Sequence, residues 1–378
     1  MAKQKQAQMA TSDFNLQKVS TKDLSKHVKG TIKIGGNLMC FGQRGTGKTE
    51  IMKSAIAASG CQEAYVNLSV MERVDLGGYP DLMSSKQDRK FVEYLLPAFF
   101  APLFDAEKPV VLLLDELDKA DPSLWAPLLE LTQFRSINGR PLTNLKAVLT
   151  TGNLISEGGS RPSLPLLDRA EKFLVEPDAT SWLNWAGEVG GIHPSITSYI
   201  QDHPNDLFGN VDPEERYADA SPRSWTRASN ILFQGEAHGW NSELLNAKVS
   251  ACVGKEIGIK YAHYYAHYQQ LLPLVDAIFK GDTVDDKFKK LEPTKKLVCT
   301  MIACARLATQ LDNLKQGAKK PQSLGYVGKF LQKVSYETAL VAIRSQINQK
   351  RMMDHEFDEL EDWKPVINSL SKAMGGEG

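Results

Sequence analysis

The octapeptide at residues 42–49, Gly-Gln-Arg-Gly-Thr-Gly-Lys-Thr, constrains this chain more than any other segment. It fits the pattern G-x-x-x-x-G-K-[ST], in which glycines allow backbone N–H groups to turn toward phosphate oxygens. The apolar residues 37–41 precede it as a strand candidate, and residues 50–59 follow it as a helix candidate. A strand, a loop and a helix in this order place a phosphate at a helix N-terminus. The segment therefore predicts a nucleoside triphosphate site.

Two acidic residues follow a second apolar segment. Residues 110–114 read Val-Val-Leu-Leu-Leu, and Asp115 and Glu116 come directly after them. Lys48 is expected to reach the β- and γ-phosphates, while the Thr49 hydroxyl and Asp115 hold Mg²⁺ as hard oxygen ligands. Glu116 is placed to polarise a water for attack on the γ-phosphate. The expected nucleotide-binding residues are Gly42, Gln43, Arg44, Gly45, Thr46, Gly47, Lys48, Thr49, Glu50 and Asp115.

Length and composition narrow the class of protein. A chain of 378 residues is long for one compact domain, so two packed units are expected. Hydrophobic content of 42%, charged content of 24% and a formal net charge of zero are typical of a soluble globular protein with no global attraction to nucleic acid or membranes. The five cysteines show no zinc-binding spacing, and no apolar segment has the length of a membrane span. We therefore expect a reduced, cytoplasmic protein.

Apolar strand candidates alternate with helical patterns in the first half of the chain. The strand candidates are residues 37–41, 64–68, 110–114, 147–151 and 172–175. This alternation predicts an α/β fold with a parallel five-stranded sheet and helices on both faces. Parallel sheets bind ligands at the carboxyl ends of their strands, where the phosphate loop, the acidic pair and Asn153 all fall. Residues 136–140 contain Asn-Gly, which predicts a tight hairpin.

Five motifs, taken in chain order, resemble those of the AAA+ ATPase superfamily and, within it, the MoxR-like group. Residues 42–49 resemble Walker A, and residues 112–116 resemble Walker B. Residues 150–153, Thr-Thr-Gly-Asn, resemble sensor 1. Residues 166–169, Leu-Leu-Asp-Arg, resemble the arginine-finger segment, and residues 221–223, Ser-Pro-Arg, resemble the sensor 2 region. The resemblance implies a P-loop domain with a helical lid, ATP and Mg²⁺ as ligands, and a homo-oligomeric ring, expected to be a hexamer.

The resemblance also implies roles for residues outside the loop and the acidic pair. Asn153 would contact the attacking water or a γ-phosphate oxygen. Arg169 would act as an arginine finger on the ATP of a neighbouring subunit, with Arg161 as the alternative finger. A salt bridge from Arg169 to Asp168 or Glu171 is the competing, purely structural interpretation.

Three further residues have assignments of this kind. Arg223 follows Ser221 as a helix N-cap and Pro222 at the first helical position, and would project from the lid toward the nucleotide. Asn67, at the end of the second strand, is either a residue that holds Glu116 in an inactive pose or a simple polar strand end. Tyr79 lies where related ring ATPases carry a pore loop, and it either grips a client or packs beneath the loop.

The expected organisation has five segments. They are a polar N-terminal tail at residues 1–30, the α/β nucleotide-binding domain at 31–190, a connector at 191–220, the helical lid at 221–300 and a helical C-terminal extension at 301–378.

The resemblance leaves the client of the ATPase open. MoxR-like ATPases remodel protein partners and often work with a von Willebrand factor A-domain protein. A motor or loader acting on DNA is an alternative, but the charges of residues 71–90 are balanced, which disfavours it. A nucleotide-gated scaffold without useful turnover is a third interpretation, disfavoured by the intact Glu116.

Overall fold

A computed structural model describes residues 16–81, 93–154, 160–176, 178–189, 191–209, 220–312, 314, 320–347, 352 and 357–374. The contacts divide the chain into two compact units. The first holds the chain up to Asp178, and the second begins at Ala179. The boundary therefore comes earlier in the chain than the expected end of the nucleotide-binding domain at residue 190.

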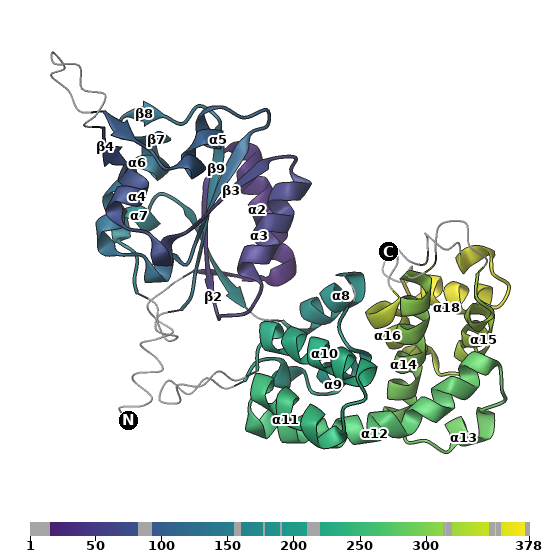
Figure 1. The fold of residues 1–378 in the computed structure, drawn as a ribbon. Helices are drawn as coiled ribbons and strands as arrows, with labels where there is room; N and C mark the ends of the chain where they lie inside the picture. Colours follow the sequence, from purple (N-terminus) through teal and green to yellow (C-terminus); the bar gives the residue numbers. More distant parts are fainter. Residues whose placement is uncertain are drawn as a thin grey trace, which may run out of the picture. The chain divides into compact units, whose positions relative to one another are not determined.

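The first unit is built on a parallel sheet (Figure 1). This sheet has six strands in the order β1-β10-β2-β9-β6-β3. The strands are β1 (Gln17–Ser20), β2 (Asn37–Gly42), β3 (Gln62–Asn67), β6 (Val110–Asp115), β9 (Leu145–Gly152) and β10 (Glu171–Glu176). The expected parallel α/β fold is confirmed, and β2, β3, β6, β9 and β10 overlap the five expected strands, with end points that differ by up to two residues. The sixth, β1, was not expected and lies at one edge of the sheet.

Helices cover both faces of this sheet (Figure 1). One face packs against α2 (Thr21–Ile34) and α3 (Lys48–Ala58). The helices of the other face are α4 (Arg73–Gly77), α5 (Ala101–Phe104), α6 (Trp125–Phe134) and α7 (Leu164–Leu167). Leu38 and Cys40 in β2 join the core under α2 and α3, while Met39 between them joins the opposite core. This alternation follows from the two-residue repeat of a strand, and it explains why residues buried on both faces read as a continuous apolar run.

Residues 16–30 differ from the polar tail expected over residues 1–30. Gln17–Ser20 pair with β10, and α2 begins directly after them. The Ser20 side chain caps this helix by accepting a hydrogen bond of 3.1 Å from the backbone N–H of Asp23. Leu24 and Val28, four residues apart, are fully buried. Lys22, Lys26 and Lys29 of this helix are exposed, on the side away from the core, which explains the polar composition of the segment.

Two short hairpins extend from the first unit. β4 (Tyr79–Pro80) pairs antiparallel with β5 (Tyr94–Leu95). β7 (Ser136–Ile137) pairs with β8 (Arg140–Pro141) through Asn138 and Gly139, whose φ angles are 50° and 71°. Two consecutive positive φ values define a type I′ turn, so the expected Asn-Gly hairpin is confirmed.

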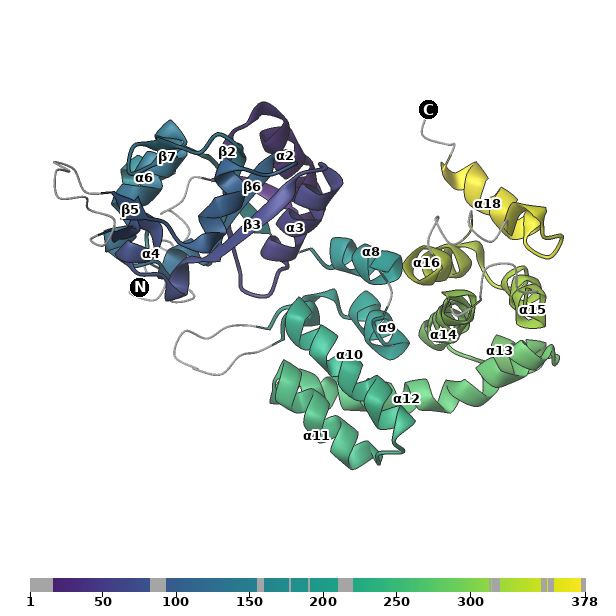
Figure 2. The ribbon, with the colours of Figure 1, turned by 45° about the horizontal axis from the view of Figure 1, so that its top comes forward.

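The described residues of the second unit form helices and loops (Figure 2). The longer helices are α8 (Ala179–Val189), α9 (Pro194–Asp202), α10 (Pro222–Ala237), α11 (Ser242–Val253), α12 (Lys255–Lys280), α14 (Pro293–Asp312), α15 (Gln322–Leu331), α16 (Tyr336–Gln346) and α18 (Lys364–Met374); α13 (Asp285–Lys289) is short. Their buried residues form one continuous apolar core. The expected connector contains α9, which belongs to this core, and the expected boundary at residue 300 falls inside α14.

The aromatic residues of α12 show how this core is built. Tyr261, Tyr265 and Tyr268 are buried along one face of the helix, and their successive rings stack with centroids 5.9 Å apart. His263 and His267, four residues apart on the same helix, are exposed. Among the described residues, no cluster of His, Cys, Asp or Glu could hold a metal ion. No described helix combines the length and the apolar character needed to cross a membrane.

Candidate functional site: a phosphate loop beside an acidic pair

The phosphate loop connects β2 to α3, as expected. Gly45 and Gly47 have φ angles of 74° and 82°, a region in which glycine is favoured because it has no Cβ. Gly47 is the N-cap of α3, so no side chain caps the first N–H groups of this helix. The first turn of a helix has N–H groups without intrahelical partners, so this turn is suited to bind an anion. Arg44 is exposed on the loop, and the Thr46 hydroxyl donates to the Gln43 carbonyl at 2.9 Å.

Lys48 is buried and lies back over the loop. Its Nζ donates to the carbonyl oxygens of Gly42 and Gln43 at 2.9 and 2.8 Å, and to Oδ1 of Asn153 at 3.3 Å. The loop carbonyls thus fix the ammonium group at the mouth of the phosphate cradle. Asn153 follows β9, the neighbour of β2, so the expected sensor residue and the expected phosphate lysine are in direct contact.

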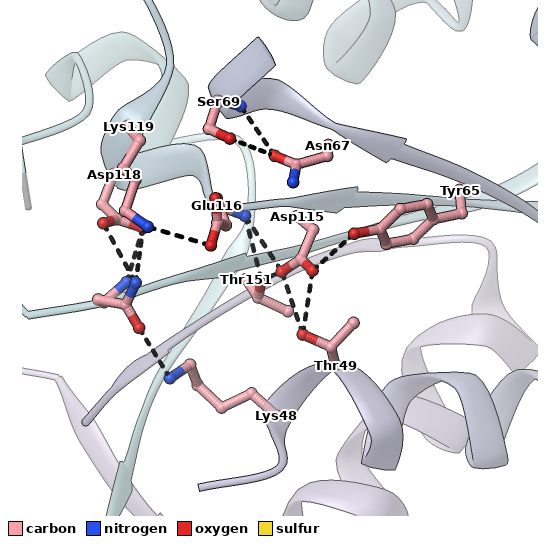
Figure 3. Close-up of polar contacts among 11 residues, drawn as sticks. Lys48, Thr49, Tyr65, Asn67, Ser69, Asp115, Glu116, Asp118, Lys119 and Thr151 are labelled. Atoms are coloured by element: carbon pink, nitrogen blue, oxygen red, sulfur yellow. Dashed lines mark hydrogen bonds and ion pairs between the residues drawn. The ribbon is translucent and has the colours of Figure 1, made fainter. Parts of the chain in front are cut away.

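Asp115 is the centre of a hydroxyl cluster (Figure 3). The Thr49 hydroxyl lies 3.1 and 3.2 Å from its two carboxylate oxygens. The Thr151 hydroxyl donates to Oδ1, and the Tyr65 hydroxyl donates to Oδ2 at 3.0 Å. Burial, and then the bond to Asp115, raises the pKa of Tyr65 to about 12. Hydroxyl and carboxylate oxygens in this arrangement fit Mg²⁺, with Thr49 and Asp115 as the groups that would hold it.

Glu116 has an unusual backbone conformation at the end of β6. Its φ is 58°, a left-handed value that costs a non-glycine residue about 1–2 kcal/mol. The carboxylate accepts from Lys119 at 3.0 Å. Burial acts to raise the pKa of Glu116, but hydrogen bonds from Lys119 and Ser69 outweigh it and hold the pKa below its ordinary value of 4.5. Glu116 therefore stays a carboxylate, the form that a general base needs.

Asn67 lies beside this carboxylate without bonding to it directly. Its Oδ1 accepts from the backbone N–H and the hydroxyl of Ser69, at 2.9 and 2.8 Å. Ser69 bonds to Asn67 (Figure 3) and also acts to lower the pKa of the Glu116 carboxylate, so this serine links the two side chains.

Asp118 is a site residue that the sequence analysis did not identify. It is buried, with only 2% of its surface exposed. Its Oδ1 accepts from the backbone N–H of Asn153 at 2.8 Å, and its two carboxylate oxygens lie 3.5 and 3.3 Å from the Asn153 side-chain nitrogen. Asp118 thereby directs the amide oxygen of Asn153 toward Lys48. Its position three residues after Asp115, in the string Asp-Glu-Leu-Asp, was the available signal.

Arg169 lies at the amino ends of the strands, whereas the phosphate loop lies at their carboxyl ends. It lies two residues before the start of β10, and its carbonyl accepts from the side chain of Asn37, the first residue of β2, at 2.9 Å. Its guanidinium donates to Gln133 and to the Pro165 carbonyl. The competing interpretation was a salt bridge from Arg169 to Asp168 or Glu171. The described contacts of the guanidinium are with Gln133 and Pro165 instead.

The remaining candidates are placed as follows. Arg161 is exposed in the segment between β9 and α7. Arg223 is exposed in the first turn of α10, where Ser221 is the N-cap and Pro222 follows it, as expected. Arg223 belongs to the second unit, whereas the phosphate loop belongs to the first. Tyr79 is 52% exposed, so it does not pack beneath its loop. Residues 86–90, part of the charge comparison, lie outside the described residues.

Comparison with known proteins adds little to this geometry. No family model and no curated protein matches the chain. Two structures of NtrX from Brucella abortus align with it, each at 14% identity and a TM-score of 0.31. The alignment covers 66% of this chain and 69% of NtrX in its ADP complex, and 69% and 72% in its ATP complex. A TM-score at this level assigns neither a family nor an activity.

Proposed function

We propose that this chain is a Mg²⁺-dependent ATPase of the AAA+ superfamily. One observation carries the proposal: the hydroxyl of Thr49, in the first turn after the phosphate loop, contacts both oxygens of Asp115 on β6. β9 separates β6 from β2, so only the folded sheet brings these two motifs together. A phosphate cradle next to an oxygen-rich magnesium site is what triphosphate hydrolysis requires.

The residues divide the reaction among them. Lys48 and the N–H groups at the start of α3 would bind the β- and γ-phosphates. Mg²⁺ held by Thr49 and Asp115 would neutralise charge that builds up on the phosphate oxygens. Glu116 would accept a proton from the water that attacks the γ-phosphorus, and Asn153 would orient that water or a γ-phosphate oxygen.

We further propose that Arg169 acts on the ATP of a second copy of the chain. It is anchored at the first residue of β2, whereas the phosphate loop follows the last residue of this strand. A six-residue strand is about 16 Å long, so Arg169 does not reach the phosphate loop of its own chain. Assembly into a ring, expected to be a hexamer, would supply the arginine from a neighbour.

Exposed apolar residues near Arg169 support contact with another copy. Phe134 and Leu164 are each 66% exposed, and Ile34 is 74% exposed. Leu164 is adjacent to Pro165, whose carbonyl binds Arg169. Arg135, next to Phe134, donates to the carbonyls of Gly35 and Gly36, which directly follow Ile34. Exposed apolar side chains next to residues that are bonded to one another at this end of the sheet fit an interface with another copy.

The client is proposed to be a protein, as in the MoxR-like group, with a von Willebrand factor A-domain protein as one candidate partner. The described part of the β4–β5 hairpin supports this choice. Tyr79, Tyr94 and Leu95 are 52%, 38% and 59% exposed, so aromatic and aliphatic side chains are available to bind a polypeptide. A cytoplasmic location is part of the same proposal.

Phosphate release from ATP, with and without Mg²⁺, tests the activity. The purified chain should release phosphate only with Mg²⁺, and Lys48→Ala should abolish both release and the binding of a fluorescent ATP analogue. Lys108→Ala, at an exposed lysine before β6, is the matched control and should behave like the wild type. Tight nucleotide binding by a folded Lys48→Ala variant would contradict the assignment of the loop.

Mixing of variants tests the role of Arg169 in trans. Lys48→Ala chains should be inactive alone and Arg169→Ala chains should keep only a low, measurable activity; a mixture of the two should be more active than either, because some interfaces then combine an intact loop with an intact arginine. Failure of the folded mixture to recover would move the finger role to Arg161 or to an arginine acting within one chain.

A further inference from the structure

The guanidinium group of Arg169 is held on one side by a single amide. Oε1 of Gln133 accepts from Nε at 2.9 Å and from Nη2 at 2.6 Å. Nη1 donates to the carbonyl of Pro165, four residues earlier in the chain. Because Nε and Nη2 share one acceptor, Gln133 occupies the side edge of the planar group. The plane of the guanidinium is thereby fixed by contacts on two sides.

These contacts leave part of the guanidinium available. An arginine has five N–H groups, and three of them have acceptors among the described residues. Of the other two, one is on Nη1 and one is on Nη2. Two N–H groups on the two terminal nitrogens are the number with which arginine binds a phosphate in bidentate fashion. Gln133 is also neutral, so it orients the guanidinium without cancelling its positive charge. Asp or Glu in its place would cancel that charge.

Gln133 itself is fixed relative to the sheet. The residue before it, Thr132, accepts at its carbonyl from the Asn37 side chain at 2.9 Å. The same Asn37 nitrogen donates to the carbonyl of Arg169 at 2.9 Å. The first residue of β2 therefore connects the last turn of α6 to Arg169, two residues before β10. Both members of the Gln133–Arg169 pair are thus attached to the same rigid element.

We infer that Gln133 is a positioning residue for Arg169 and presents its two remaining N–H groups to the γ-phosphate of a neighbouring subunit. This inference rests on the proposed trans role of Arg169. Holding a catalytic group in its reactive orientation before the reaction lowers the activation barrier, because little freedom is then lost in the transition state. Gln133 does not touch the substrate, so its effect must disappear when Arg169 is absent. An ordinary surface hydrogen bond would give no such dependence.

A double-mutant cycle on the full chain tests this inference. Gln133→Met keeps the size of the side chain and removes the acceptor. It should lower kcat for ATP hydrolysis about tenfold, which corresponds to ~1.4 kcal/mol of activation free energy, and should change KM for ATP less than about twofold. In an Arg169→Ala background the same substitution should have no further effect on kcat. Gln62→Met, at another exposed glutamine of the first unit, is the control and should leave kcat unchanged.

Each outcome decides between the alternatives. A wild-type kcat in Gln133→Met, or an equal loss of kcat in the Arg169→Ala background, would overturn the positioning role while leaving the finger role intact. A wild-type kcat in Arg169→Ala would instead remove the finger role and the inference with it. If Gln133→Met does not fold, Gln133→Asn takes its place, because it keeps the amide but is one methylene too short to reach. It should then lower kcat in the same way, and only when Arg169 is present.

Discussion

Replacing Glu116 by glutamine should separate nucleotide binding from turnover. Glutamine has the shape of glutamate but cannot accept a proton from the attacking water. The phosphate loop, Lys48 and the Thr49–Asp115 contact are unchanged by this substitution, since none of their described contacts uses the Glu116 side chain. The affinity for ATP should therefore be retained while hydrolysis becomes much slower.

The substitution should have a large effect on kcat and a small effect on the free energy of unfolding. A positioned general base contributes about 10²–10⁴-fold, so kcat should fall by that factor, or ~3–5 kcal/mol in activation free energy. The ion pair that is lost joins Glu116 to Lys119, whose side chains are 32% and 50% exposed. Exposed pairs contribute only about 0.2–1 kcal/mol, so the free energy of unfolding should change by less than about 1 kcal/mol.

The assay is single-turnover phosphate release, together with binding of a fluorescent ATP analogue and a thermal melt. Glu107→Gln is the matched control, because Glu107 is exposed in the loop before β6. It should match the wild type in all three measurements. A Glu116→Gln variant that hydrolyses ATP at the wild-type rate would refute the assignment of the base, and one that fails to bind ATP would refute the separation of binding from chemistry.

Three further substitutions test neighbouring contacts. Lys119→Met removes a hydrogen bond that lowers the pKa of Glu116, so the base form is lost at a higher pH on acidification, and the acid limb of the kcat/KM profile should move upward in pH. Asp118→Ala leaves the backbone N–H of Asn153 without its acceptor, which should destabilise the fold by about 1–3 kcal/mol in urea unfolding and lower kcat as well. Tyr65→Phe removes the hydroxyl that donates to Asp115, the carboxylate proposed to hold magnesium. It should raise the Mg²⁺ concentration for half-maximal activity about tenfold or more, as measured by magnesium titration of phosphate release. An unchanged pH profile, an unchanged urea midpoint or an unchanged magnesium requirement would contradict the respective contact.

The central strands could be predicted from sequence because strands buried on both faces are continuous apolar segments. Residues 110–114 are apolar without interruption, since both faces of β6 are covered by helices. β1 has no such apolar segment. It is four residues long, it lies at the sheet edge, and only Val19 is buried. The amphipathic helix after it was hidden in a lysine-rich composition, although Ser20 followed three residues later by Asp23 was a usable capping signal.

The candidate site was predictable where its residues are close in sequence. The phosphate loop and the acidic pair are contiguous motifs, and both lie at the expected strand ends. Tyr65 and Asp118 could not be assigned in this way, because each acquires its role from a neighbour in the folded sheet. Tyr65 pairs with Leu113 in register, so its long side chain reaches diagonally to the carboxylate two residues further on.

Arg169 shows the same limitation for ion pairing. The sequence analysis considered only the nearby acids Asp168 and Glu171 as partners. In the structure the partner is Gln133, which is 36 residues away in the chain, and Glu171 instead accepts from Thr31 at 2.6 Å. Neither contact could be predicted from nearby residues in the sequence. Both depend on which helices end beside the amino ends of the strands in the folded domain.

Phosphate release by the purified wild-type chain, measured in one titration of Mg²⁺ at saturating ATP, tests the central claim most directly. The account predicts no release when magnesium is chelated, a rise to a plateau as magnesium is added, and no response in Lys48→Ala. A chain that is folded, binds no ATP analogue and releases no phosphate at any magnesium concentration would contradict it.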